Sequence, residues 1–170
     1  MTDALLLRAG PGRRIQAAAM TPKVGAGQPQ AWPAFEAEAA PGYDVRAHPH
    51  NEAGELFHIL DGEPDLPAFE PLARTAGTWR GGEPAGGARV LRGGPGAATV
   101  VPARSPHAFA NPATTPARMP FLASPPRHQD YLDQTGELIG RAGPPDPAAI
   151  AEARARHDIQ QLTPMIVGRP

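Results

Sequence analysis

Cysteine is absent from this 170-residue sequence, which excludes disulfides, thiolate metal ligands and cysteine nucleophiles. Any metal ion would therefore have to be held by histidine and carboxylate side chains. An excess of one charge is also lacking, because 16 basic and 17 acidic residues nearly balance and no run of Lys or Arg could follow a phosphate backbone. We therefore expect no nucleic-acid partner.

Long apolar runs are missing as well. Near the N-terminus only Leu5 to Leu7 form such a run, and Asp3 precedes it. This is far too short for the apolar part of a signal peptide or for a membrane span, so we expect a cytoplasmic protein with no membrane partner. The length suits one domain with a real core and is too short for two, which predicts a single domain over residues 1–170.

Glycine and proline, by contrast, are abundant, with 19 and 23 residues or about a quarter of the chain, which approaches the composition of low-complexity sequence. They cluster between short apolar runs, as turns do between strands. Runs with strand character are residues 35–40, 43–48, 55–60, 87–91, 97–102, 107–111 and 117–124. Several short strands with regular turn signals favour an all-β sandwich or barrel over parallel βαβ units.

The sequence after residue 124 loses this alternation and is typical of helices. Asp146 followed by Pro147 predicts a helix start, with an N-cap side chain and a proline whose missing N–H costs nothing there. In the helix that follows, Ile150, Ala153 and His157 share one face. The charged residues cover the rest: Glu152, Arg154 and Arg156. This pattern indicates an amphipathic helix that lies on a surface.

His48 and His50 are the first candidate metal ligands. Their i, i+2 spacing places both imidazoles on the same face of a strand. After a turn, Glu55 begins the next strand and could bring its carboxylate back to that face, which would give one metal three ligands. The alternative is a solvated loop that happens to contain two histidines, and this fragment alone leaves both interpretations open.

A second segment has a matching pattern, with Gly96, Pro102, His107 and Asn111. The two segments resemble the paired motifs of the cupin superfamily. The second motif, G-x5-P-x-G-x2-H-x3-N, is met except that Arg104 stands where the pattern has glycine. That departure puts the backbone of the turn in doubt rather than the ligands. The first motif, G-x5-H-x-H-x4-E-x6-G, is met at every position, by Gly42, His48, His50, Glu55 and Gly62.

The resemblance implies an all-β jelly-roll barrel, with its core at about residues 33–124 and a short helical tail at 125–170. It also implies one divalent transition metal per chain. Nitrogen and oxygen ligands without thiolate are compatible with Fe, Mn, Ni, Co and Zn alike, so they do not identify the metal. The residues that match the ligands of the family are His48, His50, Glu55 and His107. Beside a cation, Glu55 could be ligand, catalytic base or both. Small cupins commonly pair, so we expect a homodimer.

At a finer level the chain resembles small, single-domain bacterial cupins of the quercetin-dioxygenase-like kind. ELFHILDGE at residues 55–63 is similar to their strand of form E-x-F-x-V-L-x-G-E, and residues 100–126 and 144–164 are similar to their last ligand segment and tail helix. This resemblance implies a dioxygenase that acts on a small enolisable or phenolic compound, with the matching glutamate helping to deprotonate the substrate. One fold hosts many activities. A metal-assisted isomerase or cyclase, and a metal-binding or small-ligand-binding protein without turnover, therefore stay open.

Side-chain parity adds candidates for a substrate pocket: Arg46, Phe57, Ile59 and Phe109. An unpaired buried guanidinium is costly, so Arg46 is expected to form a structural ion pair or to reach solvent. The three apolar residues are better explained as core.

The other polar candidates are less promising. His58 has the wrong parity to join Glu55, and His128 and His157 are expected to be solvated on helices. Asn111 is expected to form hydrogen bonds at a strand end rather than to bind metal.

The connection at residues 63–95 is longer than a minimal cupin hairpin needs. A loop or an extra pair of strands is the simpler interpretation. The functional alternative is a lid that brings Phe69, Trp79 or Arg80 near the substrate.

Overall fold

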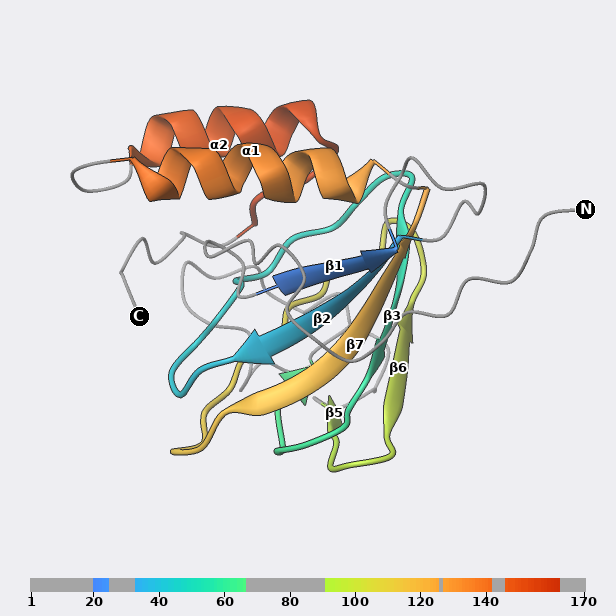
Figure 1. Cartoon of the computed structure of the whole chain (residues 1–170). Helices are drawn as coiled ribbons and strands as arrows, with labels where there is room; N and C mark the ends of the chain where they lie inside the picture. Colours follow the sequence, from blue (N-terminus) through green and yellow to red (C-terminus); the bar gives the residue numbers. More distant parts are fainter. Residues whose placement is uncertain (1–19, 25–32, 67–90, 126, 142–145, 163–170) are drawn as a thin grey trace, which may run out of the picture.

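The main sheet of the protein has five antiparallel strands in the order β1-β2-β7-β3-β6 (Figure 1). A second sheet pairs two strands of two residues each, β4 and β5. The computed structural model describes residues 20–24, 33–66, 91–125, 127–141 and 146–162, and every count given for the structure refers to these residues. The strands are β1 (Met20–Val24), β2 (Ala34–Ala39), β3 (Gly54–His58), β4 (Asp65–Leu66), β5 (Leu91–Arg92), β6 (Ala98–Val101) and β7 (Ala117–Ser124).

Alternating burial explains the central pair of strands, β2 and β7. Phe35 of β2 lies opposite Phe121 of β7, and their ring centroids are 5.5 Å apart. On β7 every second side chain is buried, which is the period of a strand with one face on the core: Ala117, Met119, Phe121 and Ala123. The strands predicted at 35–40, 55–60, 97–102 and 117–124 are confirmed, and so is the all-β class.

The predicted strands at 43–48 and 107–111 are wrong as continuous strands. The backbone of Arg46 has a φ of 66°, a left-handed conformation that interrupts the extended chain. The two segments are joined by isolated antiparallel bridges instead: Asp44 with Ala110, and His48 with His107.

These bridged segments still form a wall of the core opposite β3. The ring of Phe109 packs against that of Phe57 on β3 with centroids 5.6 Å apart, and against that of Tyr43 with centroids 5.5 Å apart. Of the predicted strand 87–91, only Leu91 lies within the described residues, where it begins β5. The lid candidates Phe69, Trp79 and Arg80 lie outside them.

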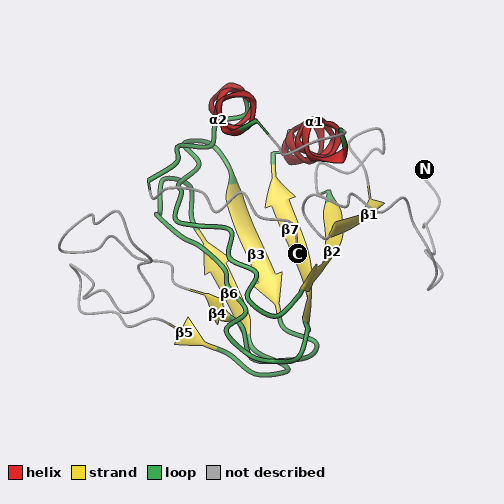
Figure 2. Ribbon diagram, turned by 90° about the vertical axis from the view of Figure 1, so that its left-hand side faces the viewer, coloured by secondary structure: helices red, strands yellow, loops and turns green. Residues whose placement is uncertain are grey.

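Two helices, α1 (His128–Gly140) and α2 (Pro147–Arg156), follow the last strand and lie together over one end of the main sheet (Figures 1 and 2). The Asp146 carboxylate accepts a hydrogen bond from the Ala148 N–H at 2.9 Å, and Pro147 occupies the first helical position. The predicted N-cap and the short C-terminal helices are therefore confirmed.

Arg154 departs from the pattern predicted for α2. Ile150 and Ala153 are fully buried as expected, but Arg154 is also only 3% exposed. Its guanidinium carbon lies 6.0 Å from the centre of the Tyr131 ring on α1. The expectation of a solvated Arg154 is wrong because α2 packs against α1, and this contact makes the buried face of α2 wider than its apolar residues indicate.

Two turns need left-handed backbone. Gly62 has a φ of 80°, and a β-carbon there would lie 2.8 Å from the Cα of Ala117, so a larger residue would be both strained and crowded. Arg104 has a φ of 69°, so the turn that lacks the expected glycine keeps a glycine-like conformation, and an arginine carries the strain.

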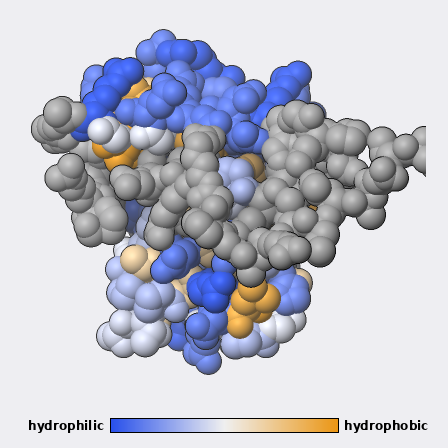
Figure 3. Space-filling model, viewed as in Figure 1, coloured by the Kyte–Doolittle hydropathy of each residue, from blue (hydrophilic) through white to orange (hydrophobic). Residues whose placement is uncertain are grey.

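Among the described residues, no helix is both long and apolar enough to cross a membrane. In Figure 3, the surface of the two helices carries mainly hydrophilic side chains.

Candidate metal centre

The backbone itself brings His48 and His107 together. The His48 N–H donates to the His107 carbonyl at 2.9 Å, and the His107 N–H donates to the His48 carbonyl at 3.0 Å. This reciprocal pair sets the two imidazoles side by side, with ring centroids 4.5 Å apart. His50, two residues further on, has its ring centroid 5.1 Å from that of His48 and 5.3 Å from that of His107.

Two of the three imidazoles are oriented by the carbonyl two residues earlier in the chain. The Nδ1 atom of His48 lies 2.7 Å from the Arg46 carbonyl oxygen, and that of His107 lies 2.9 Å from the Ser105 carbonyl oxygen. A carbonyl can only accept, so Nδ1 donates in both rings, and in a neutral imidazole the lone pair is left on Nε2. This is the arrangement by which proteins fix metal-binding histidines.

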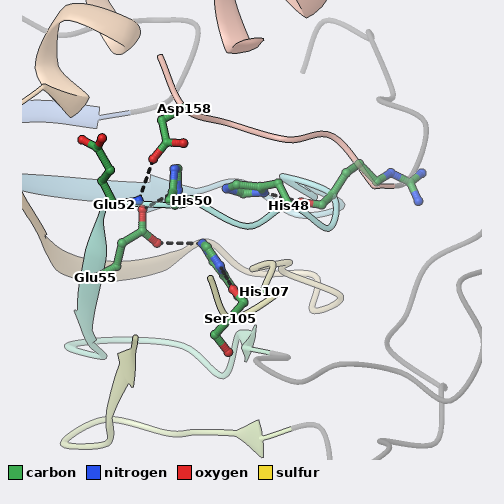
Figure 4. Close-up of polar contacts among 8 residues, drawn as sticks. His48, His50, Glu52, Glu55, Ser105, His107 and Asp158 are labelled. Carbon is green, nitrogen blue, oxygen red and sulfur yellow. Dashed lines mark hydrogen bonds and ion pairs between the residues drawn. The ribbon is translucent and has the colours of Figure 1, made fainter. Parts of the chain in front are cut away.

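Glu55, at the start of β3, places its carboxylate between His50 and His107 (Figure 4). One carboxylate oxygen lies 3.0 Å from Nε2 of His50 and the other lies 2.8 Å from Nε2 of His107. Side-chain exposure of these three residues is at most 2%. Neither Nε2 atom has a hydrogen-bond partner of acceptable geometry, although both are close to the carboxylate. Buried nitrogens of this kind call for an explanation.

The site carries one strong internal charge pairing. Burial alone would raise the pKa of Glu55, but the His107 and His50 imidazoles hold it well below its usual range. Burial opposes the charging of His107, yet Glu55 and the Ser105 carbonyl raise the pKa of His107. Burial and the neighbouring His107 hold the pKa of His48 well below its usual range. The lowered pKa of Glu55 favours an ionised carboxylate at the centre of the site, which is the form that binds a cation.

The donor atoms fit a divalent transition metal. Ligand nitrogens of His48, His50 and His107 all lie within 4.8 Å of one another, and donors on opposite sides of a bound metal are separated by about 4 Å. Glu55 is in contact with two of these three imidazoles. All four residues predicted as ligands are thus gathered at one buried point, and their donor set suits a borderline metal such as Fe, Mn, Co, Ni or Zn.

The pocket candidates fall outside the donor cluster. Arg46 lies 3.7 Å from the Asp44 carboxylate, which is the structural ion pair given above as one of its two expected roles. The three apolar candidates are at most 4% exposed and belong to the hydrophobic core: Phe57, Ile59 and Phe109. Asn111 is fully buried, and its amide donates to the carbonyls of Ala39 and Thr115, so it forms hydrogen bonds as expected.

The prediction that His128 is solvated is wrong. This first residue of α1 is partly buried and lies beside His50, with ring centroids 5.3 Å apart. Burial and the nearby imidazoles lower the pKa of His128 to about 4. Helical periodicity could not indicate this, because the first residue of a helix is placed by the way the helix docks. His58 is exposed and points away from Glu55, so in this chain it does not pack between sheets. His157 lies 2.8 Å from the Gln134 side-chain oxygen.

A second unpredicted feature is the chain after α2, which lies alongside the segment that carries His48 and His50. The Asp158 carboxylate accepts a hydrogen bond from the Glu52 N–H at 2.8 Å (Figure 4). It also accepts one from the Asn51 amide at 2.6 Å. The backbone continues this contact, because Ile159 forms a bridge with His50. The chain after α2 therefore helps to hold the segment that carries His48 and His50 in place.

No family model and no curated protein matches this sequence. The solved structures to which it is similar include a protein with a double-stranded β-helix domain and a member of the cupin superfamily. One is an uncharacterised protein with a double-stranded β-helix domain from Klebsiella pneumoniae, at 12% identity and a TM-score of 0.46 over 62% of this chain and 75% of that one. Another is a sugar phosphate isomerase of the cupin superfamily from Silicibacter pomeroyi, at 20% identity and a TM-score of 0.45 over 68% and 66%. A third is the DMSP lyase DddQ of Ruegeria pomeroyi, at 23% identity and a TM-score of 0.45 over 62% of this chain and 45% of that one.

Proposed function

We propose that this protein is a mononuclear metal-dependent enzyme, a dioxygenase that acts on a small enolisable or phenolic compound. The observation that carries the proposal is the convergence of three buried imidazoles and one ionised carboxylate at a single point. Carbonyl groups orient two of the imidazoles, and no sulfur ligand is available in the chain.

The energetics of the site support a bound cation. Burying a carboxylate and three imidazoles carries desolvation costs even when they pair with one another, as Glu55 does with His50 and His107 at 3.0 and 2.8 Å. Hydrophobic residues of similar size would avoid these costs, so a ligand role is the simplest reason for placing these groups in the core.

The chain's own residues account for the rest of the chemistry. When bound, one divalent transition metal would supply Lewis acidity, which acidifies a coordinated hydroxyl, and, for a redox-active metal, one-electron chemistry. The ionised Glu55 can then accept the proton of an enol or phenol. The aromatic rings of Phe57 and Phe109 in the adjoining core exclude water and strengthen these interactions.

Oxygen uptake tests the proposal. Protein reloaded separately with Fe, Mn, Co, Ni or Zn is offered flavonols and 1,3-dicarbonyl compounds, and we expect oxygen consumption that requires metal. Glu55→Gln should keep its fold and slow turnover by about 10²–10⁴-fold, whereas His58→Ala, an exposed change on the same strand, should have no effect.

The other outcomes separate the alternatives. Metal-dependent turnover without oxygen consumption would reject the dioxygenase in favour of an isomerase or cyclase. Metal retained without turnover of any substrate would favour a binding protein, and failure to retain any of the five metals would overturn the proposal.

A further inference from the structure

Packing alone does not explain why residue 128 is a histidine. Its ring lies edge-on to Phe121, Tyr131 and Phe35, with centroids 5.2, 5.6 and 6.3 Å apart. A phenylalanine could make the same contacts with greater apolar burial. The imidazole adds only its two nitrogens, so their surroundings indicate what the residue does.

One of those nitrogens lies near the candidate metal site. A nitrogen of His128, a nitrogen of His50 and a carboxylate oxygen of Glu55 all lie within 4.8 Å of one another. This limit also describes the set formed by His48, His50 and His107. His50 belongs to both sets. Glu55 belongs to the second set and also contacts His107 of the first.

We propose that His128 is a further protein ligand of the cation held at this site. The centre then has two overlapping donor sets, His48–His50–His107 and His50–Glu55–His128, which act on one metal ion. This inference rests on the proposed metal-dependent function and deepens it. The consequence is a ligand supplied by helix α1, from outside the two motifs that carry the other four.

The surroundings of His128 favour a ligand role. Aromatic rings on three sides hold the imidazole in one orientation, which lowers the entropy lost on metal binding. The residue is also the first of α1, so the position of this helix over the end of the sheet becomes coupled to the metal. With all five donors bound, an octahedral metal would retain one position for an exogenous ligand.

The test uses Co(II) as the probe, because its visible absorption reports both binding and ligand number. We expect the unmodified chain to bind one Co(II). His128→Phe keeps the aromatic packing and should weaken Co(II) binding at least tenfold and change the absorption spectrum. His58→Ala, which removes an exposed imidazole, should do neither. Thermal unfolding of each apo-protein checks that the variants are folded.

The shared position of His50 makes a sharper prediction. His50→Ala removes a donor from both sets and should weaken Co(II) binding most. His48→Ala and His128→Phe each leave one set intact and should lie between this variant and the unmodified chain. The double variant His48→Ala/His128→Phe should bind more weakly than either single variant.

Three results would overturn the inference while leaving the proposed function standing. These are an unchanged spectrum and affinity in folded His128→Phe, equal losses in His48→Ala and His50→Ala with none in His128→Phe, and binding of two Co(II) ions per chain. Failure of the unmodified chain to bind any of the five metals would instead remove the proposed function on which the inference rests.

Discussion

Gly62 offers a test of how tightly the turn after β3 is packed. In Gly62→Ala, the new β-carbon would lie 2.8 Å from both the Cα and the Cβ of Ala117 and 3.1 Å from the carbonyl oxygen of Pro116. These atoms belong to backbone or to a short side chain, so none of them can swing away. Gly42 is the matched control, because its φ of 78° is close to the 80° of Gly62 but nothing lies within 4 Å of its added β-carbon.

The two substitutions separate backbone strain from crowding. Holding alanine in a left-handed conformation costs roughly 1–2 kcal/mol, and this applies to Gly42→Ala and Gly62→Ala alike. Overpacking adds about 1–3 kcal/mol only in Gly62→Ala. We therefore expect losses in the free energy of unfolding of roughly 1–2 kcal/mol for Gly42→Ala and about 2–5 kcal/mol for Gly62→Ala, with the loss in Gly62→Ala the larger by about 1–3 kcal/mol.

Urea unfolding measures both losses. If the free energy of unfolding falls with urea concentration at the same slope in both variants and in the unmodified chain, the compactness of the folded and unfolded states has not changed. Equal losses in the two variants would refute the close approach of Gly62 to Ala117. If Gly42→Ala had no effect at all, the strain assigned to a left-handed alanine would be refuted instead. Co(II) affinity of the folded variants should match that of the unmodified chain, because neither glycine contacts a donor atom.

Three further predictions concern other parts of the fold. Burial would raise the pKa of Asp158, but hydrogen bonds from Glu52 and Asn51 lower it. The stability that the ionised Asp158 carboxylate supplies is therefore fully present above its ordinary pKa, and it is lost as pH falls through the lowered pKa. In urea unfolding, Asp158→Ala should have a lower free energy of unfolding than the unmodified chain at pH 7, and this difference should shrink below about pH 4. A difference that does not change with pH would contradict this prediction. Asn111→Ala removes two amide donations and the bond that Ala113 N–H donates to its side-chain oxygen, and should lower the free energy of unfolding by about 3 kcal/mol; a loss under 1 kcal/mol would show that water replaces the amide. Asp146→Ala removes the N-cap of α2 and should cost about 1 kcal/mol, with faster amide exchange confined to α2, whereas slower or unchanged exchange would argue against the cap.

The sequence was most informative where the chain alternates regularly. In β7, small and large apolar residues fall on every second position, and the predicted and observed strand are the same eight residues, Ala117–Ser124. The same logic failed for residues 43–48, because Arg46 takes a left-handed backbone that no alternation reveals. His48 and His50 nevertheless lie close together, with ring centroids 5.1 Å apart, although isolated bridges, of His48 with His107 and of His50 with Ile159, replace the continuous strand.

The buried and polar contacts that escaped prediction, within the site and beside it, lie after β7. His128 and Arg154 are on helices, and periodicity describes which side of a helix is apolar but not where the helix docks. Asp158 reaches the metal-site segment from a turn with a φ of 62°, and one carboxylate in a polar stretch has no distinctive pattern. Contacts of this kind depend on tertiary packing between distant segments, which local residue spacing does not record.

The reciprocal hydrogen bonds between His48 and His107 have a thermodynamic consequence. They join two segments far apart in the chain, so the unfolded protein has no comparable set of donors, and a metal ion held at the proposed site would bind the folded state almost exclusively. A cation at 100 times its dissociation constant then adds about 2.7 kcal/mol to the stability, which for a chain of this size raises the melting temperature by roughly 5–10 °C. Metal supply would thus act on the lifetime of the protein as well as on its chemistry, because chains without the cation would unfold and be degraded first.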